Sequence, residues 1–259
     1  MGDEALRITT WNVNGLRAAL RKGFAEHLEA VAPDVLLLQE IRSRPEQLEE
    51  GWDAPAGWHV AWHPAERPGY AGTAVWSRHP IEVVGVGLDG VDPEGRVLRV
   101  RTGGVTVVSV YLPSGSASPE SQARKEVWMA AFAPWARALA ASGEPVVLGG
   151  DLNIAHTERD IWNPKGNAKL SGFLPHERAW FGDLLAQGWT DTVRVSAGEV
   201  QGPYSWWSNR GQARALDRGW RIDYLLANAA AARRLTGAET RRAGGLEVSD
   251  HAPVTCDLG

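Results

Sequence analysis

Along the chain, hydrophobic positions alternate in some segments and recur at helical spacing in others. Short runs rich in valine, isoleucine and aromatic residues predict strands. These runs cover residues 6–13, 34–40, 58–64, 71–78, 81–88, 96–102, 105–113, 145–150, 204–210, 221–227 and 252–258. Turn-forming residues separate most of them, as expected for short strands in packed sheets.

Longer segments with apolar residues at three- and four-residue spacing predict helices. They cover residues 15–32, 118–142 and 175–188. In the second segment Ser118 is a suitable N-cap, Pro119 occupies the first helical position and Gln122 is placed for a capping box. Residues 157–175 are polar and contain proline and glycine, which predicts an irregular connection.

Many short strands with a few helices between them favour two packed sheets with helices outside, an α/β sandwich. The chain has 259 residues, of which 44% are hydrophobic, so it can bury a full core. The sequence contains no repeat of the period that solenoids require. We therefore expect one domain over residues 1–259.

Composition excludes several classes of protein. The single cysteine, Cys256, rules out an intrachain disulfide framework and is expected to be a small core residue. The charged N-terminus lacks the apolar stretch of a signal peptide, and no apolar run reaches the ~18 residues of a membrane span. We expect a soluble protein of the cytoplasm.

Basic residues are clustered in parts of the chain, although the net charge is negative. A net charge of −4 argues against a protein that simply coats nucleic acid. Basic residues are nevertheless concentrated in residues 14–24, 205–221 and 233–242. A focused basic surface can coexist with an acidic total, so charge alone leaves open both a polyanion-binding surface and ordinary scattered arginines.

Carboxylate and amide side chains stand at the ends of four predicted strands. They are Asn12 and Asn14, Glu40, Asp151 and Asn153, and Asp250 followed by His251. Because strand ends gather at the rim of a sheet, we expect these side chains to converge. An oxygen-rich set without a Cys/His cluster suits Mg²⁺ or Mn²⁺ rather than zinc.

Each of these groups also has an ordinary explanation when taken alone. Asp151 and Asn153 can form a turn, and Glu40 could be a solvated strand end. Convergence is favoured because the ordinary explanation requires four separate coincidences of residue type and position. Gly149 and Gly150, which precede the turn, are expected to leave room for a substrate backbone.

The segments that carry a family resemblance are, in chain order, "TWNVNGLRA", "LLLQE", "GGDLNIAH", "NPKGN", "SGFLPHERAWF", "GWRIDYLL" and "SDHAPV". Together they resemble the exonuclease III class of AP endonucleases, within the endonuclease/exonuclease/phosphatase superfamily. The similarity runs from about residue 7 to residue 258. "LQE", "GDLN" and "SDH" indicate only the superfamily, whereas "NPKGN", "GFLPHERAWF" and "WRIDYLL" are far more specific and point to DNA repair nucleases. The resemblance implies a four-layer α/β sandwich.

The resemblance implies a metal site whose principal carboxylate is Glu40. Asn12 and Asn14 match the metal-shell pair, and Asp250 matches a second acidic residue of the site. Here Asn14 stands where some family members have aspartate. The remaining residues expected at this site are Asp151, Asn153 and His251.

The resemblance also implies catalytic roles. Asp151 would orient and deprotonate the attacking water, Asn153 would hold a phosphate oxygen, and His251 would contact the scissile phosphate. An unperturbed aspartate is a weak base at neutral pH, so His251 and metal-bound water remain alternatives to Asp151 as the base. Asp223 would orient His251; alternatively, it is a buried strand acid paired with Arg221 or another basic residue.

Tyr111 in "VYLP" resembles the tyrosine that lies near the phosphate and the leaving group in this family. The segment after it, residues 114–121, reads "SGSASPES" and departs from the family pattern. In relatives this segment shapes the rim that faces DNA. The departure therefore bears on exonuclease activity and on how product DNA is held.

Aromatic residues point to a substrate pocket. By resemblance, Trp206, Trp220 and Ile222 line a pocket that accepts an abasic deoxyribose and excludes a normal nucleotide; packing within a sheet is the alternative for the two tryptophans. By strand alternation, Trp207 faces the other way and is expected in the core. Residues expected to contact DNA are Arg17, Arg21, Lys22, Lys165 and Asn167.

The favoured function is a Mg²⁺-dependent, monomeric DNA repair nuclease acting on double-stranded DNA with abasic sites or blocked 3′ ends. It would incise 5′ to the abasic site in base excision repair, and 3′→5′ exonuclease and 3′-end-cleaning phosphodiesterase or phosphatase activities are further candidates. One alternative is a phosphoesterase of the superfamily acting on a phosphoinositide or sphingolipid headgroup, which "NPKGN" and the aromatic pocket disfavour. A DNA-binding module without catalysis is disfavoured by the complete set of polar residues.

Overall fold

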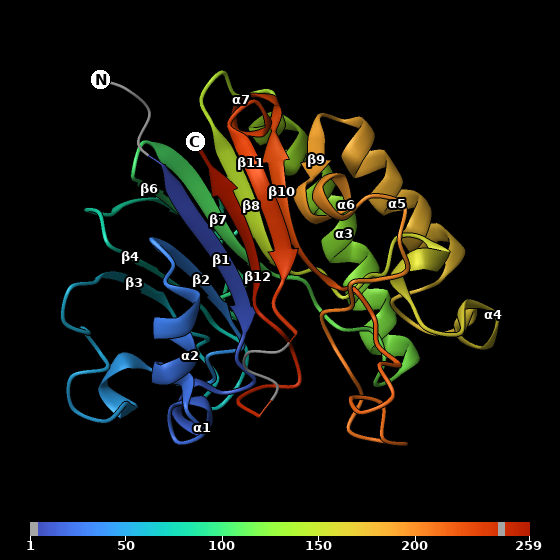
Figure 1. The fold of residues 1–259 in the computed structure, drawn as a ribbon, viewed down its shortest axis with the longest axis horizontal. Coiled ribbons are helices and arrows are strands. Elements are labelled where there is room, and N and C mark those ends of the chain that lie inside the picture. Colours follow the sequence, from blue (N-terminus) through green and yellow to red (C-terminus); the bar gives the residue numbers. More distant parts are fainter. Residues whose placement is uncertain (1–4, 243–246) are drawn as a thin grey trace.

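The computed structural model describes residues 5–242 and 247–259. Two six-stranded sheets pack face to face (Figure 1). The first sheet has the strand order β11 (Leu235–Thr240), β12 (Val254–Leu258), β1 (Leu6–Asn12), β2 (Val35–Gln39), β4 (Thr73–Ser77) and β3 (His59–His63). The second has the order β5 (Glu82–Val86), β6 (Val97–Thr102), β7 (Val105–Tyr111), β8 (Val146–Asp151), β10 (Asp223–Asn228) and β9 (Trp189–Asp191). Both sheets are mixed, because β1–β2 and β7–β8 are parallel pairs within otherwise antiparallel sheets.

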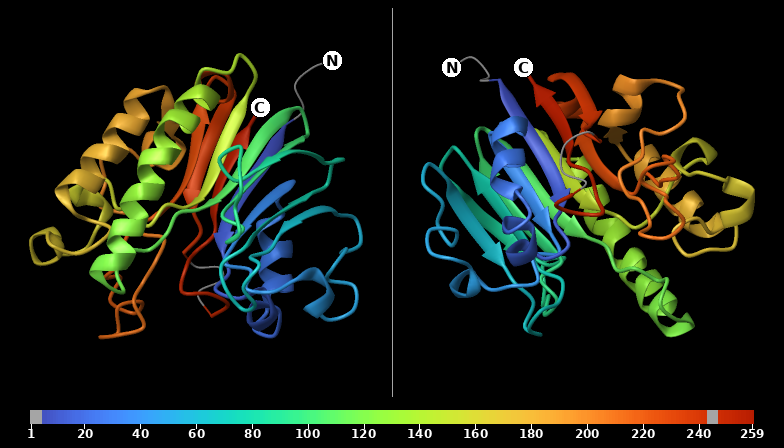
Figure 2. Two further views of the ribbon diagram at one scale, coloured as in Figure 1. Left: turned by 180° about the vertical axis from the view of Figure 1, so that it is seen from behind. Right: turned by 60° about the horizontal axis from the view of Figure 1, so that its bottom comes forward.

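Helices lie outside both sheets, which gives the fold four layers (Figure 2). α1 (Leu16–Leu20) and α2 (Phe24–Val31) cover the first sheet, whereas α3 (Pro119–Ala140) and α5 (Pro175–Ala186) cover the second. Short elements in the connections are α4 (Pro164–Asn167), α6 (Thr192–Ala197), α7 (Ala229–Ala232) and the 3₁₀ turns Pro45–Gln47 and Glu158–Asp160. The predicted four-layer α/β sandwich is therefore confirmed.

Apolar side chains fill the spaces between the layers. Leu37, Leu225 and Cys256 lie between the two sheets, so the expected core position of the cysteine is confirmed. Phe132 of α3 packs on the second sheet, and Phe24 of α2 packs on the first. Full burial of one such side chain contributes about 1.5–3 kcal/mol. In the described part of the chain, no helix is both long and apolar enough to cross a membrane.

Two predicted elements differ from the structure. The helix expected over residues 15–32 is broken into α1 and α2, because Gly23 adopts φ +92°, which a continuous α-helix does not permit. The strand expected over residues 204–210 is wrong: the amide of Trp206 bonds to Trp220, whereas the amide of Trp207 bonds to the carbonyl of Asp250. The segment thus crosses between two partners instead of pairing in register with one.

The cap of α3 is built differently from the prediction. The Ser118 hydroxyl accepts the amide of Ser121, as expected for an N-cap, but the reciprocal partner is the Ser121 hydroxyl, which accepts the Ser118 amide at 2.8 Å. Gln122 lies one position too late for this role. Its side chain instead accepts from Ser171 at 2.6 Å and donates to Glu177 at 3.1 Å, joining α3 to the neighbouring loop and α5.

The expectation that Gly149 and Gly150 leave room for a substrate is also wrong. A Cβ on Gly149 would lie 2.6 Å from side-chain atoms of both Leu37 and Leu225, which belong to the space between the sheets. A Cβ on Gly150 would lie 1.8 Å from the carbonyl oxygen of Val110 in the adjacent strand. Both glycines are therefore required by close packing inside the sandwich, not by access to the pocket.

Candidate active site

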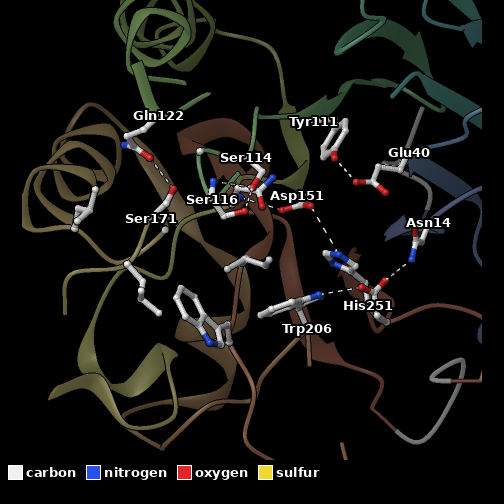
Figure 3. A pocket seen from close by; sticks show the side chains of 18 of the residues that line it. Asn14, Glu40, Tyr111, Ser114, Ser116, Gln122, Asp151, Ser171, Trp206 and His251 are labelled. Atoms are coloured by element: carbon white, nitrogen blue, oxygen red, sulfur yellow. Dashed lines mark hydrogen bonds and ion pairs between the residues drawn. The ribbon is translucent and has the colours of Figure 1, made fainter. Parts of the chain in front are cut away.

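A pocket of about 750 Å³ opens at the rim where the polar strand ends converge (Figure 3). The strand ends and the loops after them supply its walls. The predicted site residues among its lining are Asn14, Glu40, Tyr111, Asp151, Asn153, Trp206, Trp220, Ile222, Asp250 and His251. Asn12 and Asp223 do not line the pocket and reach it through hydrogen bonds to residues that do.

Asp151, the last residue of β8, lies at the base of the pocket and is almost fully buried. Its Oδ1 accepts the amide of Asn153 at 2.9 Å, and its Oδ2 accepts the side-chain amide of Asn12 at 3.0 Å. Burial, and then the nearby charge of Asp223, raise the pKa of Asp151 well above the usual aspartate range, although His251 opposes this. The carboxyl group is therefore held in place with an unusually high proton affinity.

His251 faces Asp151 from the segment before β12 (Figure 3). Its Nε2 lies 3.9 Å from Oδ2 of Asp151, and its Nδ1 lies 2.8 Å from Oδ2 of Asp223. Burial alone lowers the pKa of His251, but the charge and hydrogen bond of Asp223 outweigh it and raise this pKa above the usual histidine range. Asp223 is thus paired with His251 and not with Arg221, whose guanidinium binds other carboxylates.

Asn153 follows Asp151 in a backbone conformation with φ +49°. Its side-chain nitrogen donates to the carbonyl of Leu112 at 2.8 Å, which orients the amide group. Its own carbonyl accepts from Nζ of Lys125 at 2.9 Å. Lys125 forms a 2.6 Å ion pair with Glu177, and both side chains are completely buried. This pair anchors the loop that carries Asn153.

Lys125 and Glu177 were absent from the residues singled out in the sequence. A signal was nevertheless present, because Lys125 falls on the same helical face as Met129 and Phe132, both of which are buried. A lysine on an apolar face predicts a buried ion pair. The partner could not be identified from the helical pattern alone.

Side-chain oxygen atoms that could bind a hard cation lie at the mouth of the pocket. Glu40 accepts a hydrogen bond from the hydroxyl of Tyr111 and pairs with Arg42 at 3.0 Å. The amide nitrogen of Asn14 donates to Oδ1 of Asp250 at 3.1 Å. Carboxylates and amide oxygens in this arrangement match the donor chemistry of Mg²⁺ or Mn²⁺.

A second group of possible metal ligands is buried deeper in the site. Ligand atoms of Asp151, Asp223 and His251 lie within 4.8 Å of one another, so this buried cluster could also hold a metal ion. Asn12 is fully buried, and both ends of its amide are engaged, by the Asn14 backbone and by Asp151. Asn12 therefore acts on the site by holding Asp151.

Tyr111, at the end of β7, is about nine-tenths buried. Burial raises its pKa well above 10, and the charges of Glu40 and Asp151 raise it further. The phenol therefore keeps its proton and donates a hydrogen bond to the carboxylate of Glu40. Beneath the ring, the buried guanidinium of Arg96 lies 4.8 Å from the ring centroid and donates to the Tyr111 carbonyl at 3.0 Å.

An aromatic wall closes one side of the pocket. The rings of Trp206 and Trp220 meet edge to face with centroids 6.0 Å apart, and Ile222 packs with them. The indole nitrogen of Trp206 donates to Oδ2 of Asp250 at 3.1 Å, which links this wall to the mouth of the pocket. Trp207 is completely buried in a separate cluster, so its predicted core position is confirmed.

The opposite side of the pocket is lined by hydroxyl groups that the sequence analysis did not single out individually. Ser114 and Ser116 are hydrogen-bonded to each other at 2.9 Å, and Ser171 donates to Gln122 (Figure 3). Ser114 and Ser116 place polar, uncharged groups on this side of the pocket.

The residues expected to contact DNA lie on two separate elements. Arg17 belongs to α1, with Arg21 and Lys22 directly after it, and all three are exposed. Lys165 and Asn167 belong to α4, which lies far from α1 in the fold (Figure 1). Neither group lines the pocket.

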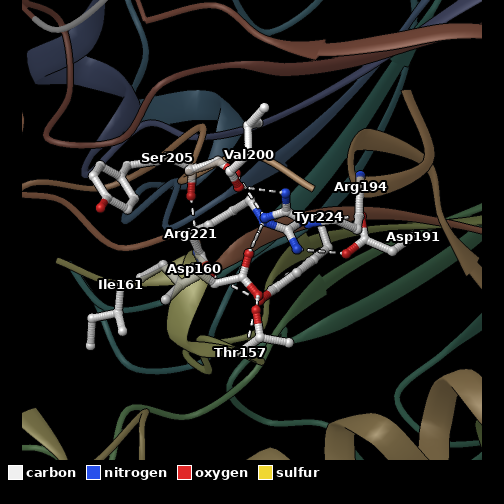
Figure 4. A network of polar contacts seen from close by, with 12 residues as sticks. Thr157, Asp160, Ile161, Asp191, Arg194, Val200, Ser205, Arg221 and Tyr224 are labelled. Atoms are coloured by element: carbon white, nitrogen blue, oxygen red, sulfur yellow. Dashed lines mark hydrogen bonds and ion pairs between the residues drawn. The ribbon is translucent and has the colours of Figure 1, made fainter. Parts of the chain in front are cut away.

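One arginine of the basic segment 205–221 is not a surface residue. Arg221 is almost completely buried, and its guanidinium binds Asp160 at 2.7 Å and Asp191 at 2.7 and 3.0 Å (Figure 4). Arg194 also binds Asp160, at 2.6 Å. Burial by itself raises the pKa of Asp160, but the charge and hydrogen bond of Arg221 outweigh it and hold this pKa at about 2. The network joins the 3₁₀ turn Glu158–Asp160, the end of β9, α6 and the segment before β10.

Comparison with known proteins agrees with this geometry. Residues 9–251 match the Endonuclease/Exonuclease/phosphatase family. The chain is 36% identical to an exodeoxyribonuclease of Bacillus subtilis, over 96% of this chain and 98% of that protein. The 3′ phosphatase NExo from Neisseria, bound to product DNA hairpin, is 31% identical with a TM-score of 0.88, over 98% of this chain and 99% of that chain. An AP endonuclease from Archaeoglobus fulgidus is 26% identical with a TM-score of 0.88, over 97% and 98%.

These similarities extend over nearly the whole length of the chain. The family match begins within β1 and ends at His251, so it includes every strand end that supplies the pocket. The resemblance to AP endonucleases that the sequence motifs indicated is confirmed by these relatives. The chain therefore belongs to the endonuclease/exonuclease/phosphatase family.

Proposed function

We propose that this chain is a DNA repair nuclease that hydrolyses the phosphodiester 5′ to an abasic site and leaves a 3′-hydroxyl end. The observation that carries the proposal is the single pocket shared by the facing pair Asp151 and His251 and by the aromatic wall of Trp206 and Trp220. The first pair provides groups for hydrolysis, and the wall provides a surface for a sugar without a base. The exodeoxyribonuclease and AP endonuclease relatives support the same function.

In this proposal Asp151 is the base that takes a proton from the attacking water. Its raised pKa makes it a far better base than an ordinary aspartate. His251 is disfavoured as the base, because Asp223 raises its pKa and holds it as a cation near neutral pH. A cationic imidazole is instead suited to donate a hydrogen bond to an oxygen of the scissile phosphate.

Two further side chains are proposed to contact the reacting group. Asn153 holds a phosphate oxygen, because its amide is fixed beside Asp151 by the Leu112 carbonyl. Tyr111 is proposed to lie near the leaving group with its hydroxyl protonated, so its single O–H can donate a hydrogen bond there when it is released from Glu40. Fixed donors of this kind stabilise developing charge without reorganisation during the reaction.

Glu40, Asn14 and Asp250 are proposed to hold Mg²⁺, with Mn²⁺ as a substitute. Asn12, Asp151, Asn153 and His251, which were also expected at the metal site, surround it without binding the cation directly, because the Asn12 amide is engaged at both ends and His251 is a cation. The donor chemistry at the mouth of the pocket supports this choice. A bound divalent cation supplies electrostatic stabilisation of the charge that develops on the phosphate. Tyr111 and Arg42 fix the carboxylate of Glu40 before a cation arrives.

We further propose that Trp206, Trp220 and Ile222 accept the abasic deoxyribose. The same apolar wall is proposed to exclude intact nucleotides. Phosphates on either side of the damage would contact Arg17, Arg21, Lys22, Lys165 and Asn167. The substrate is then double-stranded DNA with an abasic site, and blocked 3′ ends are a second substrate that the 3′ phosphatase NExo from Neisseria supports.

Residues 1–259 are proposed to act as one monomeric catalytic domain, since the described residues place all the groups used above around one pocket. A cytoplasmic location remains our expectation. The 3′→5′ exonuclease and 3′-phosphatase activities follow from the same hydrolytic groups acting at a strand end.

The proposal is tested by offering the protein three substrates side by side. These are a duplex with one tetrahydrofuran abasic analogue, the same duplex without damage, and an inositol phosphate. We expect Mg²⁺-dependent incision of the first, slow trimming of the second from its 3′ ends, and no release of phosphate from the third. Preferential hydrolysis of the inositol phosphate would overturn the proposal.

A further inference from the structure

Ser205 lies directly behind the active site and is completely buried. Its hydroxyl donates to Oδ2 of Asp223 at 2.7 Å and accepts the backbone amides of Ile222 and Asp223, each at 3.0 Å. A serine hydroxyl has one donor and two acceptor positions, so these contacts use its whole hydrogen-bonding capacity. Such complete use inside a protein fixes the hydroxyl in a single orientation.

One oxygen atom, Oδ2 of Asp223, is hydrogen-bonded to both Ser205 and His251. Nδ1 of His251 lies 2.8 Å from Oδ2 of Asp223, whereas Oδ1 of Asp223 is buried without a hydrogen-bond partner in the described structure. The rotation of the Asp223 carboxylate therefore depends on two contacts at one oxygen atom. Without Ser205, the histidine would be the only remaining restraint on its own orienting acid.

Ser205 also joins three segments of the chain through its backbone. Its amide donates to the carbonyl of Trp220 at 2.9 Å, and its carbonyl accepts the amide of Ala252 at 2.7 Å. These contacts connect the aromatic wall to the segment that carries His251. Figure 4 shows Ser205 in the same region as Arg221, whose neighbour Ile222 donates its amide to the Ser205 hydroxyl.

We infer that Ser205 is a positioning residue that fixes the Asp223 carboxylate, and through it the imidazole of His251, relative to the aromatic wall. The inference rests on the proposed function for its kinetic consequences. Ser205 does not line the pocket and touches no reacting atom. Its effect is therefore expected in the orientation of His251 and not in substrate binding.

The test compares the variants Ser205→Ala and Ser205→Thr with a matched control, Ser77→Ala. Ser77 is also fully buried, and its hydroxyl is hydrogen-bonded to Thr102 at 2.6 Å and accepts the amide of His79. We expect Ser205→Ala to lower kcat on the abasic duplex about 10-fold or more with KM within about 2-fold, as for partners that orient a histidine. Ser205→Thr, which keeps the hydroxyl, should restore kcat, and Ser77→Ala should leave kcat unchanged.

A double variant separates orientation from general stability. If Ser205 acts through Asp223, then adding Ser205→Ala to Asp223→Ala should lower kcat no further than Asp223→Ala alone. Thermal unfolding of each variant identifies losses that come from partial unfolding. Additive losses in kcat, or an equal kcat in Ser205→Ala and Ser77→Ala, would overturn the inference.

A second readout does not depend on activity. The Nδ1 proton shared by His251 and Asp223 should give a separate low-field proton signal in the NMR spectrum, absent in Asp223→Ala. We expect Ser205→Ala to shift or broaden this signal and Ser205→Thr to restore it. An unchanged signal in Ser205→Ala would overturn the inference about Ser205, whether or not the protein cleaves DNA. Failure of the wild-type protein to cleave DNA would overturn only the proposed function.

Discussion

Oδ2 of Asp151 and Nε2 of His251 face each other at 3.9 Å, and both side chains are buried. This separation is too long for a direct hydrogen bond, but one oxygen atom placed between them could bond to both. The two groups reach this position from different sheets, since Asp151 ends β8 and His251 precedes β12. The gap is the place where we expect the attacking water or a phosphate oxygen to lie.

Replacing the base should remove catalysis and leave DNA binding intact. Asp151→Asn keeps the size of the side chain but cannot accept a proton from water. We expect kcat on an abasic duplex to fall by ~10²-fold or more, with KM little changed. Asp183→Asn makes the same chemical change on an exposed face of α5 and serves as the control. A kcat within about 3-fold of wild type in Asp151→Asn would contradict the assignment.

The pH dependence should report the same carboxyl group. Burial, followed by the charge of Asp223, raises the pKa of Asp151 to about 8, and the active form is the deprotonated one. The rate constant kcat/KM should therefore rise with pH from about 6 and level off near the raised pKa, since protonation at lower pH removes the base. A profile measured at fixed Mg²⁺ that falls over this range would argue for a different base.

Loss of the principal metal carboxylate should change the cation requirement. Glu40→Gln removes one negative charge from the mouth of the pocket, so binding of Mg²⁺ weakens. We expect EDTA to abolish incision by the wild-type enzyme, and Glu40→Gln to need at least about 10-fold more Mg²⁺ for half-maximal rate. Glu46→Gln, on an exposed 3₁₀ turn nearby, should titrate like the wild type. Identical Mg²⁺ titrations of Glu40→Gln and wild type would place the cation elsewhere.

The aromatic wall should decide which substrate is cleaved. Trp220→Ala removes the ring that meets Trp206 edge to face. We expect kcat/KM for the abasic duplex to fall about 10-fold or more, because apolar pocket contacts contribute roughly 1–3 kcal/mol. When the enzyme removes a 3′-phosphate, no abasic sugar contacts this wall. The kcat/KM for that reaction should therefore fall much less. Equal losses on both substrates would mean that the ring only supports the fold.

The buried network behind the wall should contribute strongly to stability. Arg221→Met leaves Asp160 and Asp191 buried without their main cation. The free energy of unfolding should fall by about 3–5 kcal/mol, as when one partner of a buried ion pair is removed. Arg159→Met removes a cation that pairs with Glu199 at the surface and should cost less than about 1 kcal/mol. Denaturant unfolding measures the free energy of unfolding of both variants. A loss in Arg221→Met as small as that in Arg159→Met would contradict the role of the network.

The sequence predicted the parts of the fold that have strong local signals. Strands such as β2 and β8 are continuous apolar runs, and α3 carries both a cap and helical spacing, so each could be located from the pattern. β9 and β11 were not predicted. β9 has three residues, and β11 is largely polar at a sheet edge, so neither has a clear period.

The sequence predicted the site residues that stand at strand ends. It did not predict the contacts between segments that are distant in the sequence. The convergence of Glu40, Asp151 and His251 followed from residue type and the expected rim of a sheet. The role of Ser205 could not be predicted, because its partners come from residues that are distant in sequence and no strand pattern pairs them. The purpose of Gly149 was misjudged for the same reason, since Leu37 approaches it from the opposite sheet.

The most direct test of the account maps the product of wild-type cleavage on a duplex with one tetrahydrofuran analogue, labelled at the 5′ end of the damaged strand. With Mg²⁺ the account predicts one labelled product that ends in a 3′-hydroxyl on the nucleotide before the analogue. The same reaction in EDTA should give no product. Absence of incision with both Mg²⁺ and Mn²⁺, or cleavage on the 3′ side of the analogue, would contradict the central claim.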